Sequence, residues 1–421
     1  MSTGYASIYL DETQCVGCTT CTQRCPTQAI RVRNGKPVIM QDRCVDCGEC
    51  IHVCPHHAMK ARVDLLDEEL KKHKYNIALP SSALYGQFAG IRSRNPILEG
   101  LRRIGFDSVF EVAAAAEVMA GVIHSELAFG SIPHPIITTS CPVILRVIRI
   151  RFPSLMSHLL TYHSPSEVAA RWSKRMAMKE TGLEEKDIGC VFISPCPAKC
   201  ASAKAALGTE SRALTGVVSI GEVVPRLHAV MDGIEDREHS AQAGAMGVGW
   251  AMSGGQADSV REPNHVAASG MENIIRILEA LENGKLSNVE LVELNACYPG
   301  CVGGPLTVEN PFIAKARIRH MMAGFGPVIP TGECPLDALR WEKTPVSHPV
   351  LRLDPDLAVA MEKMERIRTI AASLRGIDCG ACGSPTCRAF AEDIVAGQAE
   401  ESMCVFYDRP AAGKADGASR S

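Results

Sequence analysis

The chain has 421 residues, of which 46% are hydrophobic and 22% are charged. This is enough chain for about two or three domains, and the hydrophobic content excludes a disordered or fibrous protein. The formal net charge of −3 predicts no general attraction to nucleic acid or to anionic membranes. We expect no membrane span, and residues 1–15 lack the basic start and apolar core of a signal peptide, so a cytoplasmic location is predicted.

The 19 cysteines are the most informative part of the composition. Cytosolic thiols stay reduced, so clustered cysteines in such a protein indicate metal ligands rather than disulfides. Two runs with the spacing C-x2-C-x2-C-x3-C, each followed by proline, extend from Cys15 to Cys25 and from Cys44 to Cys54. The duplicated run resembles the bacterial ferredoxins, in which the fourth cysteine of each run binds the other cluster.

That resemblance implies two [4Fe–4S] clusters in a ferredoxin-like α+β domain over residues 1–62. The ligands of the first cluster are expected to be Cys15, Cys18, Cys21 and Cys54, and those of the second Cys44, Cys47, Cys50 and Cys25. Zinc is the alternative, although zinc modules usually pair two C-x2-C knuckles across a longer gap. A connector is expected over 63–76, in which the charged segment Asp64–Lys74 is predicted to form a solvated helix.

From Tyr75 onward, short apolar stretches alternate with segments of helical length. Strands alternating with helices predict an α/β domain with mostly parallel sheets and ligands beyond the carboxyl ends of the strands. The candidate strands are Asn76–Leu79, Ser108–Val112, Pro135–Thr138, Cys190–Ile193 and Val289–Leu294.

Three of these stretches run directly into cysteine-containing loops. Cys141 lies in TTSCP, Cys196 in SPCPAK, and Cys297 and Cys301 in ELNACYPGCVGGP. Three separate loops would thereby bring four thiols together, which suits one more iron–sulfur cluster.

These three segments resemble, in the same order, the three signatures of the [FeFe]-hydrogenase large-subunit domain. The resemblance continues through GFDSVFEV, SPSEVAAR, MSGG and SGMENIIRILE, and covers nearly all of residues 77–345. It implies a two-lobed domain in which Cys141, Cys196, Cys297 and Cys301 hold a [4Fe–4S] cluster. It also implies that Cys301 bridges to a diiron subcluster with CO and cyanide ligands (the H-cluster), and that Lys199 donates a hydrogen bond to a cyanide.

The chain departs from the family along the proton route. Ser140 occupies the position of the proton-relay cysteine, and Ser194 stands where a methionine usually precedes Pro-Cys at the cofactor. The stretch 119–124 lacks the usual adjacent glutamates, although Glu117 and Glu126 lie nearby. A serine hydroxyl is a far weaker acid than a thiol, whose pKa is about 8.5. We therefore expect the departures to lower turnover more than cluster binding.

Three cysteines and one glycine-rich segment are left over. Cys190 is predicted to be a small buried residue of a strand, Cys200 to lie near the cluster without binding iron, and Cys334 to be structural or exposed. The segment Gly244–Gly255 favours close backbone packing near the cofactor over nucleotide binding.

A small helical iron–sulfur domain is expected over residues 351–407. Pro355–Leu374 is predicted to form a helix, followed by a second helical stretch over Arg388–Ser402. The four cysteines Cys379, Cys382, Cys387 and Cys404 follow the spacing C-x2-C-x4-C-x16-C. This resembles a small iron–sulfur domain of electron-transport and corrinoid proteins, also found on sensory hydrogenases, and zinc is again the alternative. Residues 408–421 are expected to be a disordered tail.

Together these features predict a hydrogenase-like redox protein of low turnover, sensing H2 or redox state through four [4Fe–4S] clusters. Its expected ligands are H2 and protons, and its expected partner is a redox protein, either a ferredoxin or a signalling protein. Two alternatives remain: a true ferredoxin-dependent hydrogenase, and an electron-transfer or assembly protein without the diiron subcluster.

Overall fold

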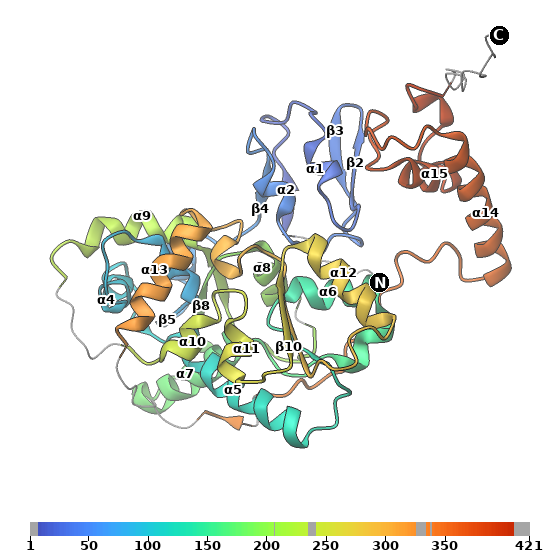
Figure 1. Cartoon of the computed structure of the whole chain (residues 1–421). Helices are drawn as coiled ribbons and strands as arrows, with labels where there is room; N and C mark the ends of the chain where they lie inside the picture. The colour runs from blue at the N-terminus through green and yellow to red at the C-terminus, as the bar shows by residue number, and fades with distance from the viewer. Residues whose placement is uncertain (1–6, 206, 235–240, 326–333, 337–338, 408–421) are drawn as a thin grey trace, which may run out of the picture. The chain divides into compact units, whose positions relative to one another are not determined.

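The computed structural model describes residues 7–205, 207–234, 241–325, 334–336 and 339–407 (Figure 1). The predicted tail at 408–421 lies outside these residues. The described chain divides into two compact units. The first contains residues 7–8, 45–48 and 61–348, and the second contains residues 9–44, 49–60 and 349–407.

The first unit contains a four-stranded parallel sheet in the order β6-β5-β8-β9. The central strand β8 is buried at every position, as expected when helices cover both faces of a parallel sheet. The strands are β5 (Tyr75–Pro80), β6 (Ser108–Val109), β8 (Ile188–Ser194) and β9 (Gly216–Ser219). Helices α4 (Asn95–Arg103), α7 (Pro165–Thr181) and α9 (Ile220–Met231) pack against these strands, whereas α5 (Val112–Phe129) packs on α7.

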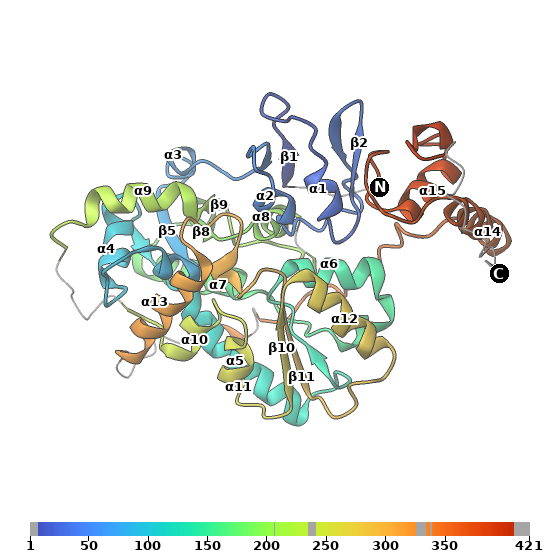
Figure 2. The same cartoon turned by 45° about the horizontal axis from the view of Figure 1, so that its top comes forward.

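A second parallel sheet of the same unit has the strand order β10-β11-β7. Figure 2 shows β10 and β11 side by side, with α12 alongside. The elements are β7 (Ile136–Ile137), β10 (His265–Ser269), β11 (Leu291–Asn295) and α12 (Met271–Glu282). The predicted α/β class with mostly parallel sheets is therefore confirmed. The remaining helices of this unit are α3 (Leu66–Glu69), α6 (Pro142–Arg151), α8 (Pro197–Lys204), α10 (Ala245–Gly249), α11 (Gly255–Val260) and α13 (Pro311–Ala323).

Among the described residues, one helix, α5, is long and apolar enough to cross a membrane by length and composition alone. Its residues Ala113–Ala116 are buried, and it packs against α7 and α10. Small buried side chains allow such close helix packing, so the position of α5 in the protein core accounts for its apolar composition.

The helix over Asp64–Lys74 is much shorter than predicted, although most of the charged side chains of this segment are exposed, as expected. The helix α3 covers only Leu66–Glu69, and both of its terminal residues are buried. Asp64 instead accepts hydrogen bonds from the backbone N–H of Val217 at 2.9 Å and from Lys204 Nζ at 2.7 Å. Asp64 therefore binds neighbouring elements of the core, whereas the side chains of Asp67, Glu68, Lys71, Lys72 and Lys74 are exposed to water.

The second unit joins ferredoxin-like and helical segments. The hairpin of β2 (Ile30–Arg33) and β3 (Lys36–Ile39) is antiparallel, and α1 (Thr20–Gln23) and α2 (Glu49–His52) pack together. At the ends of the ferredoxin-like segment, β1 (Ile8–Leu10) and β4 (Met59–Ala61) form a two-stranded sheet.

The C-terminal segment of the second unit is helical, as expected. Here α14 (Leu357–Ser373) packs on α15 (Cys387–Val395). The second helix ends at Val395, earlier than the predicted Ser402, and Gly397 follows in the left-handed conformation that commonly ends helices.

Candidate metal centres

The four isolated cysteines of the first unit come from the ends of strands in both sheets. Cys141 follows β7 and precedes α6, whereas Cys196 follows β8 and precedes α8. Cys297 lies just after β11, and Cys301 begins a short 3-10 helix at Cys301–Gly303. The structure thus brings the predicted set together from three loops at the carboxyl ends of parallel strands.

These thiols lie close enough to oppose one another's ionisation. Burial raises the pKa of Cys297 well above its usual range, and charges on Cys196, Cys141 and Cys301 raise it further. Burial likewise raises the pKa of Cys196, to about 12, and that of Cys141. Converging buried thiols become thiolates when a positively charged metal group compensates them, so this set fits such a group.

Within the described part of the chain, no three His, Cys, Asp or Glu side chains are placed to hold a single metal ion.

Lys199, on α8, provides a positive charge beside the thiols. Its Nζ donates a hydrogen bond to Cys301 Sγ at 3.4 Å. Burial lowers the pKa of Lys199, but the negative charges of Cys301, Cys196 and Cys141 outweigh it, and the net shift is upward. The side chain is therefore a charged ammonium aimed at Cys301, and it can donate to an anionic ligand there.

A cavity of about 60 Å³ borders two of the four cysteines, Cys141 and Cys301. Within the described residues no Asp, Glu or His side chain lines it, so its titratable groups are the two cysteines and Lys199. The cavities at the other two cysteine sets are about 20 Å³ each. The cavity at the central site, which borders both Cys141 and Cys301, is thus larger than those at the other two cysteine sets. The other lining residues include Ser81, Ser82, Ser140, Ser166, Phe192, Gln256 and Asn295.

Ser140 lies in this cavity, as the sequence predicted. Its hydroxyl donates to Gln256 Oε1 at 3.3 Å. The nearby carboxylates are not at the cavity wall: Glu117 accepts from the backbone N–H of Gly247 at 3.1 Å, and Glu126 accepts from the hydroxyl of Tyr162 at 2.9 Å. The direct neighbour of the relay position is therefore an amide, which does not titrate near neutral pH.

Ser194 is buried at the end of β8 and bonds its own loop. Its hydroxyl donates to the carbonyl of Cys196 at 3.0 Å and accepts from the Cys196 N–H at 3.3 Å. It therefore positions the cysteine loop instead of lining the cavity.

Two polar residues behind the cavity were missed by the sequence reasoning. The buried Glu293 of β11 accepts the backbone N–H groups of Gly254, Gln256 and Ala257 at 3.0 Å each, and burial raises its pKa to about 7. Asn295 lines the cavity, donates to Glu293 at 3.3 Å, and has a buried Oδ1 with no hydrogen-bond partner. A glutamate inside the apolar run VELVEL was the available signal, because buried carboxylates need several donors.

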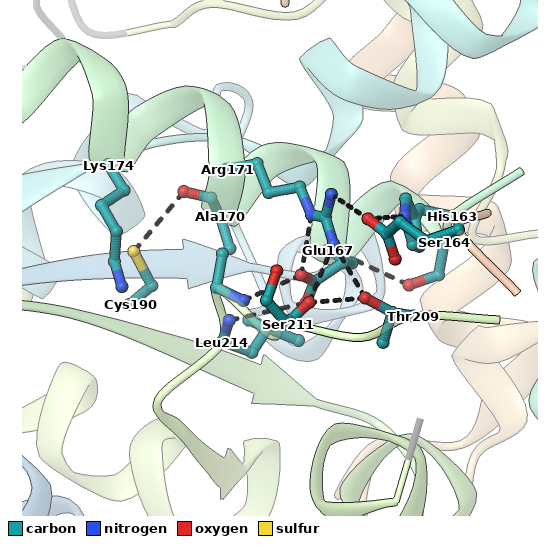
Figure 3. A network of polar contacts seen from close by, with 12 residues as sticks. His163, Ser164, Glu167, Ala170, Arg171, Lys174, Cys190, Thr209, Ser211 and Leu214 are labelled. Carbon is teal, nitrogen blue, oxygen red and sulfur yellow. Dashed lines mark hydrogen bonds and ion pairs between the residues drawn. The ribbon is translucent and has the colours of Figure 1, made fainter. Parts of the chain in front are cut away.

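A polar network holds the start of α7, whose residues Pro165 and Ser166 also line the cavity (Figure 3). The Arg171 guanidinium bonds Glu167 at 3.0 Å, Glu342 at 2.8 Å and Thr209 at 2.9 Å. Glu167 also accepts from the backbone N–H of Ala213 at 2.8 Å. This network joins α7 to loops far away in sequence and fixes one wall of the cavity.

The loop carrying Cys47 packs beside the central cysteines. A Cβ on Gly48 would lie 2.3 Å from Pro305 and 3.3 Å from Pro197, the residue after Cys196, and φ here is +78°. The adjacent buried Asp46 accepts from the Ser7 N–H at 2.8 Å and bonds Arg146 of α6. Only glycine fits this close approach.

The ferredoxin-like segment brings together Cys15, Cys18, Cys21 and Cys54, the first of the two expected sets. A cavity of about 20 Å³ is lined by Cys15, Cys18, Cys21 and Cys54. Burial raises the pKa of Cys50 well above its usual range, and charges on Cys44 and Cys25 raise it further, so these three thiols of the second set are neighbours.

The C-terminal cysteines also share one cavity. Its walls include all four predicted ligands, Cys379, Cys382, Cys387 and Cys404. Gly380 and Gly383 of this loop have φ of +72° and +82°, which suits the tight turns that were predicted.

The remaining cysteines do not contribute to a set. Cys190 is fully buried in β8, and Cys200 is fully buried on α8, where its thiol contacts the Cys196 carbonyl at 3.5 Å. Cys334 is half-buried against the core. In the glycine-rich segment, a Cβ on Gly247 would lie 2.0 Å from the Ala113 carbonyl oxygen, which agrees with close backbone packing at the cavity.

Comparison with known families assigns the central domain. Residues 75–263 and 256–305, more than half of the chain, match the family described as "Iron only hydrogenase large subunit, C-terminal domain". The chain belongs to the iron-only hydrogenase large-subunit family. Residues 7–55 of this hydrogenase-family chain match the family "4Fe-4S dicluster domain", and residues 374–406 match the family described as "Putative Fe-S cluster".

Two curated relatives are similar to the central part of this hydrogenase-family chain. The "Periplasmic [Fe] hydrogenase large subunit" of Nitratidesulfovibrio vulgaris is 31% identical over 210 residues, which is 46% of this chain and 50% of the relative. "Iron hydrogenase 1" of Clostridium pasteurianum is 29% identical over 220 residues, which is 46% of this chain and 38% of the relative. The matches thus span half or less of these relatives' lengths.

Solved structures support the fold. A variant of the [FeFe]-hydrogenase from Chlamydomonas reinhardtii aligns with a TM-score of 0.50 at 16% identity, over 67% of this chain and 98% of that one. An apo form of another variant of the same enzyme aligns with a TM-score of 0.50 at 17% identity, over 67% of this chain and 98% of that chain. At this identity the likeness establishes the shared fold alone.

Proposed function

We propose that this hydrogenase-like iron–sulfur protein is a redox or H2 sensor of low turnover, with four [4Fe–4S] clusters and a diiron subcluster in the cavity beside Cys301. The observation that carries the proposal is the lining of that cavity. Cys301 and Lys199 line the cavity, and no carboxylate or imidazole of the described residues does so. Ser140, which also lines it, donates its hydroxyl hydrogen to the side-chain amide of Gln256.

The residues of the cavity fit the diiron group. Cys301 is a member of the thiol set and also lines the cavity, so its sulfur can bind both the cluster and a neighbouring metal unit. Lys199 would donate to an anionic ligand of that unit. When bound, the diiron unit supplies the metal site for the interconversion of H2 with two protons and two electrons.

The chain's own residues supply protons poorly. A relay at neutral pH needs groups whose pKa lies near the working pH. Neither the hydroxyl of Ser140 nor the side-chain amide of Gln256, which are hydrogen-bonded to each other, titrates near neutral pH. The backbone N–H of Gln256 donates a hydrogen bond to Glu293 at 3.0 Å. Ser140 bonds the side chain of Gln256, whereas Glu293 bonds its backbone. Gln256 therefore stands between the two residues, and no single hydrogen bond carries a proton from Glu293 to Ser140.

The chain's own residues support electron exchange better. The Cys47 loop packs against Pro197, beside Cys196, and the other cysteine sets surround cavities of their own. A protein that retains its electron route while its proton route is weakened would change oxidation state with H2 but turn over slowly. Its partner would be a redox or signalling protein that reads the clusters.

Infrared spectroscopy after anaerobic maturation, combined with H2 assays, tests the proposal. We expect bands from CO and cyanide together with slow H2 evolution or uptake. Fast steady-state turnover of the unaltered protein would instead identify a true hydrogenase. Complete absence of the bands, with a maturation system that loads a control hydrogenase, would identify an electron-transfer or assembly protein.

A further inference from the structure

The C-terminal cysteine set and the ferredoxin-like segment belong to one compact unit and are joined by a buried ion pair. Arg31 Nε of β2 lies 2.6 Å from Asp393 Oδ2 of α15, and both side chains are only 4% exposed. Arg33 Nη2 lies 2.8 Å from the same oxygen, and Ser384 Oγ donates to it at 2.6 Å. One carboxylate oxygen thus binds two arginines of the ferredoxin-like segment and a serine of the C-terminal loop.

The peptide groups of the C-terminal cysteines are bonded directly by the ferredoxin-like segment. Gln23 Nε2 of α1 donates to the Cys379 carbonyl at 3.1 Å. Arg33 Nη1 lies 3.5 Å from the Cys382 carbonyl. The Val32 N–H donates to the carbonyl of Gly383, the next residue, at 2.7 Å.

Val32 links the wall of one ferredoxin-like cavity to the C-terminal cysteine loop. It lines the cavity of Cys15, Cys18, Cys21 and Cys54, and its N–H donates to the carbonyl of Gly383, in the peptide between Gly383 and Ser384. Ser384 lines the C-terminal cavity, so one hydrogen bond and the Gly383 carbonyl group connect Val32 to the wall of that cavity. Electron transfer between metal centres depends steeply on the bonded path between them, and this path is short and contains no solvent gap.

We propose that the C-terminal cluster exchanges electrons directly with the first ferredoxin cluster through Val32, and that Asp393 is the positioning residue that holds the two together. The step moves one electron from a reduced [4Fe–4S] cluster to an oxidised one, with no bond formed or broken. The inference rests on the proposed cluster content, and it makes the C-terminal cluster a branch of the ferredoxin relay rather than a separate module.

Two buried features make the contact specific. Removing the Asp393 charge would leave two arginines without their carboxylate, which is costly at buried sites. A methyl group on Gly383 would lie 2.0 Å from the Val32 carbonyl oxygen and would push the cysteine loop away from β2. Either change should open the path while leaving the cysteines in place.

The test compares Asp393→Asn and Gly383→Ala with matched controls in the full chain. Glu365→Gln removes an exposed carboxylate of α14, and Gly397→Ala has the same left-handed strain, with φ of +69° against +82°, but meets nothing within 4 Å. Iron and sulfide contents identify which variants keep all clusters. The readout is the dipolar broadening of the C-terminal cluster's EPR signal when the ferredoxin clusters are also reduced.

We expect the broadening in the unaltered protein and both controls, and its loss in Asp393→Asn and Gly383→Ala. Equal broadening in all five proteins, or none in the unaltered protein with every cluster present, would overturn the inference. If either Asp393→Asn or Gly383→Ala loses its C-terminal cluster, the EPR broadening of the other variant tests the inference. The CO and cyanide bands, which test the proposed function, should be the same in all variants, so the two ideas fail separately.

Discussion

The buried carboxyl of Glu293 gives a quantitative test of the site's electrostatics. Burial raises its pKa to about 7 from its usual 4.5, although three backbone N–H groups and Asn295 stabilise the ionised form. Between pH 4.5 and about pH 7, Glu293 is therefore protonated in the folded state but ionised in the unfolded state. Folding stability therefore falls as pH rises from 4.5 to 7, and is independent of this group above that range.

The size of the effect follows from the pKa difference. At about 1.4 kcal/mol per unit, the full window is worth about 3 kcal/mol. Between about pH 5 and pH 8, about 2.5 kcal/mol of it should appear. The Glu293→Gln variant lacks this titrating group. The difference in unfolding free energy between the unaltered protein and the variant should therefore fall by about 2.5 kcal/mol from pH 5 to pH 8.

The assay is urea unfolding followed by tryptophan fluorescence. Trp172, Trp250 and Trp341 are all in the unit that contains Glu293, so the signal reports that unit alone. Glu272→Gln, at an exposed position of α12, controls for the loss of one carboxylate. A difference that is constant with pH would refute the reasoning, because it would mean that the backbone donors keep Glu293 ionised despite its burial.

Three further changes have expected outcomes. Ser140→Cys should raise H2 evolution in a dye-coupled assay by about 10²–10⁴-fold, because it restores a titratable group to the cavity; unchanged rates would place the limit elsewhere. Lys199→Met should lower the iron content of the central site, measured by metal analysis, because it removes the ammonium bonded to a ligand thiol; full iron loading would exclude that role. Gly247→Ala should lower the melting temperature by the equivalent of about 1–3 kcal/mol, because its methyl group would meet the Ala113 carbonyl. Gly121→Ala, with open space around it, should not lower it.

The local cysteine patterns were sufficient to predict where thiols would gather. The crossed grouping of Cys54 with Cys15, Cys18 and Cys21 was implied by the resemblance of the duplicated run to bacterial ferredoxins. The strand before Cys196 was visible because a fully buried parallel strand is one continuous apolar run.

Long-range polar contacts could not be predicted in this way. Arg31 and Asp393 are separated by 362 positions, and no periodicity links a strand arginine to a helix aspartate. Likewise, the segment around Asp64 appeared to be a solvated charged helix, whereas Asp64 binds the backbone of Val217. A sequence shows which residues are charged, and a buried charged residue needs a hydrogen-bonding or oppositely charged partner. The sequence does not show which residue is that partner.

The proposed proton and electron routes can be tested separately in one experiment. In a Ser140→Cys background with measurable turnover, adding Asp393→Asn should leave H2 evolution from a reduced dye unchanged, because small dyes reach the ferredoxin clusters without the C-terminal cluster. Reduction of the C-terminal cluster by H2, followed by EPR after rapid freezing, should become slower in the same double variant. If dye-driven evolution instead fell to the same extent, the C-terminal cluster would be the obligatory entry point for electrons and not a branch, since breaking the Arg31–Asp393 contact would then interrupt the only route to Cys301.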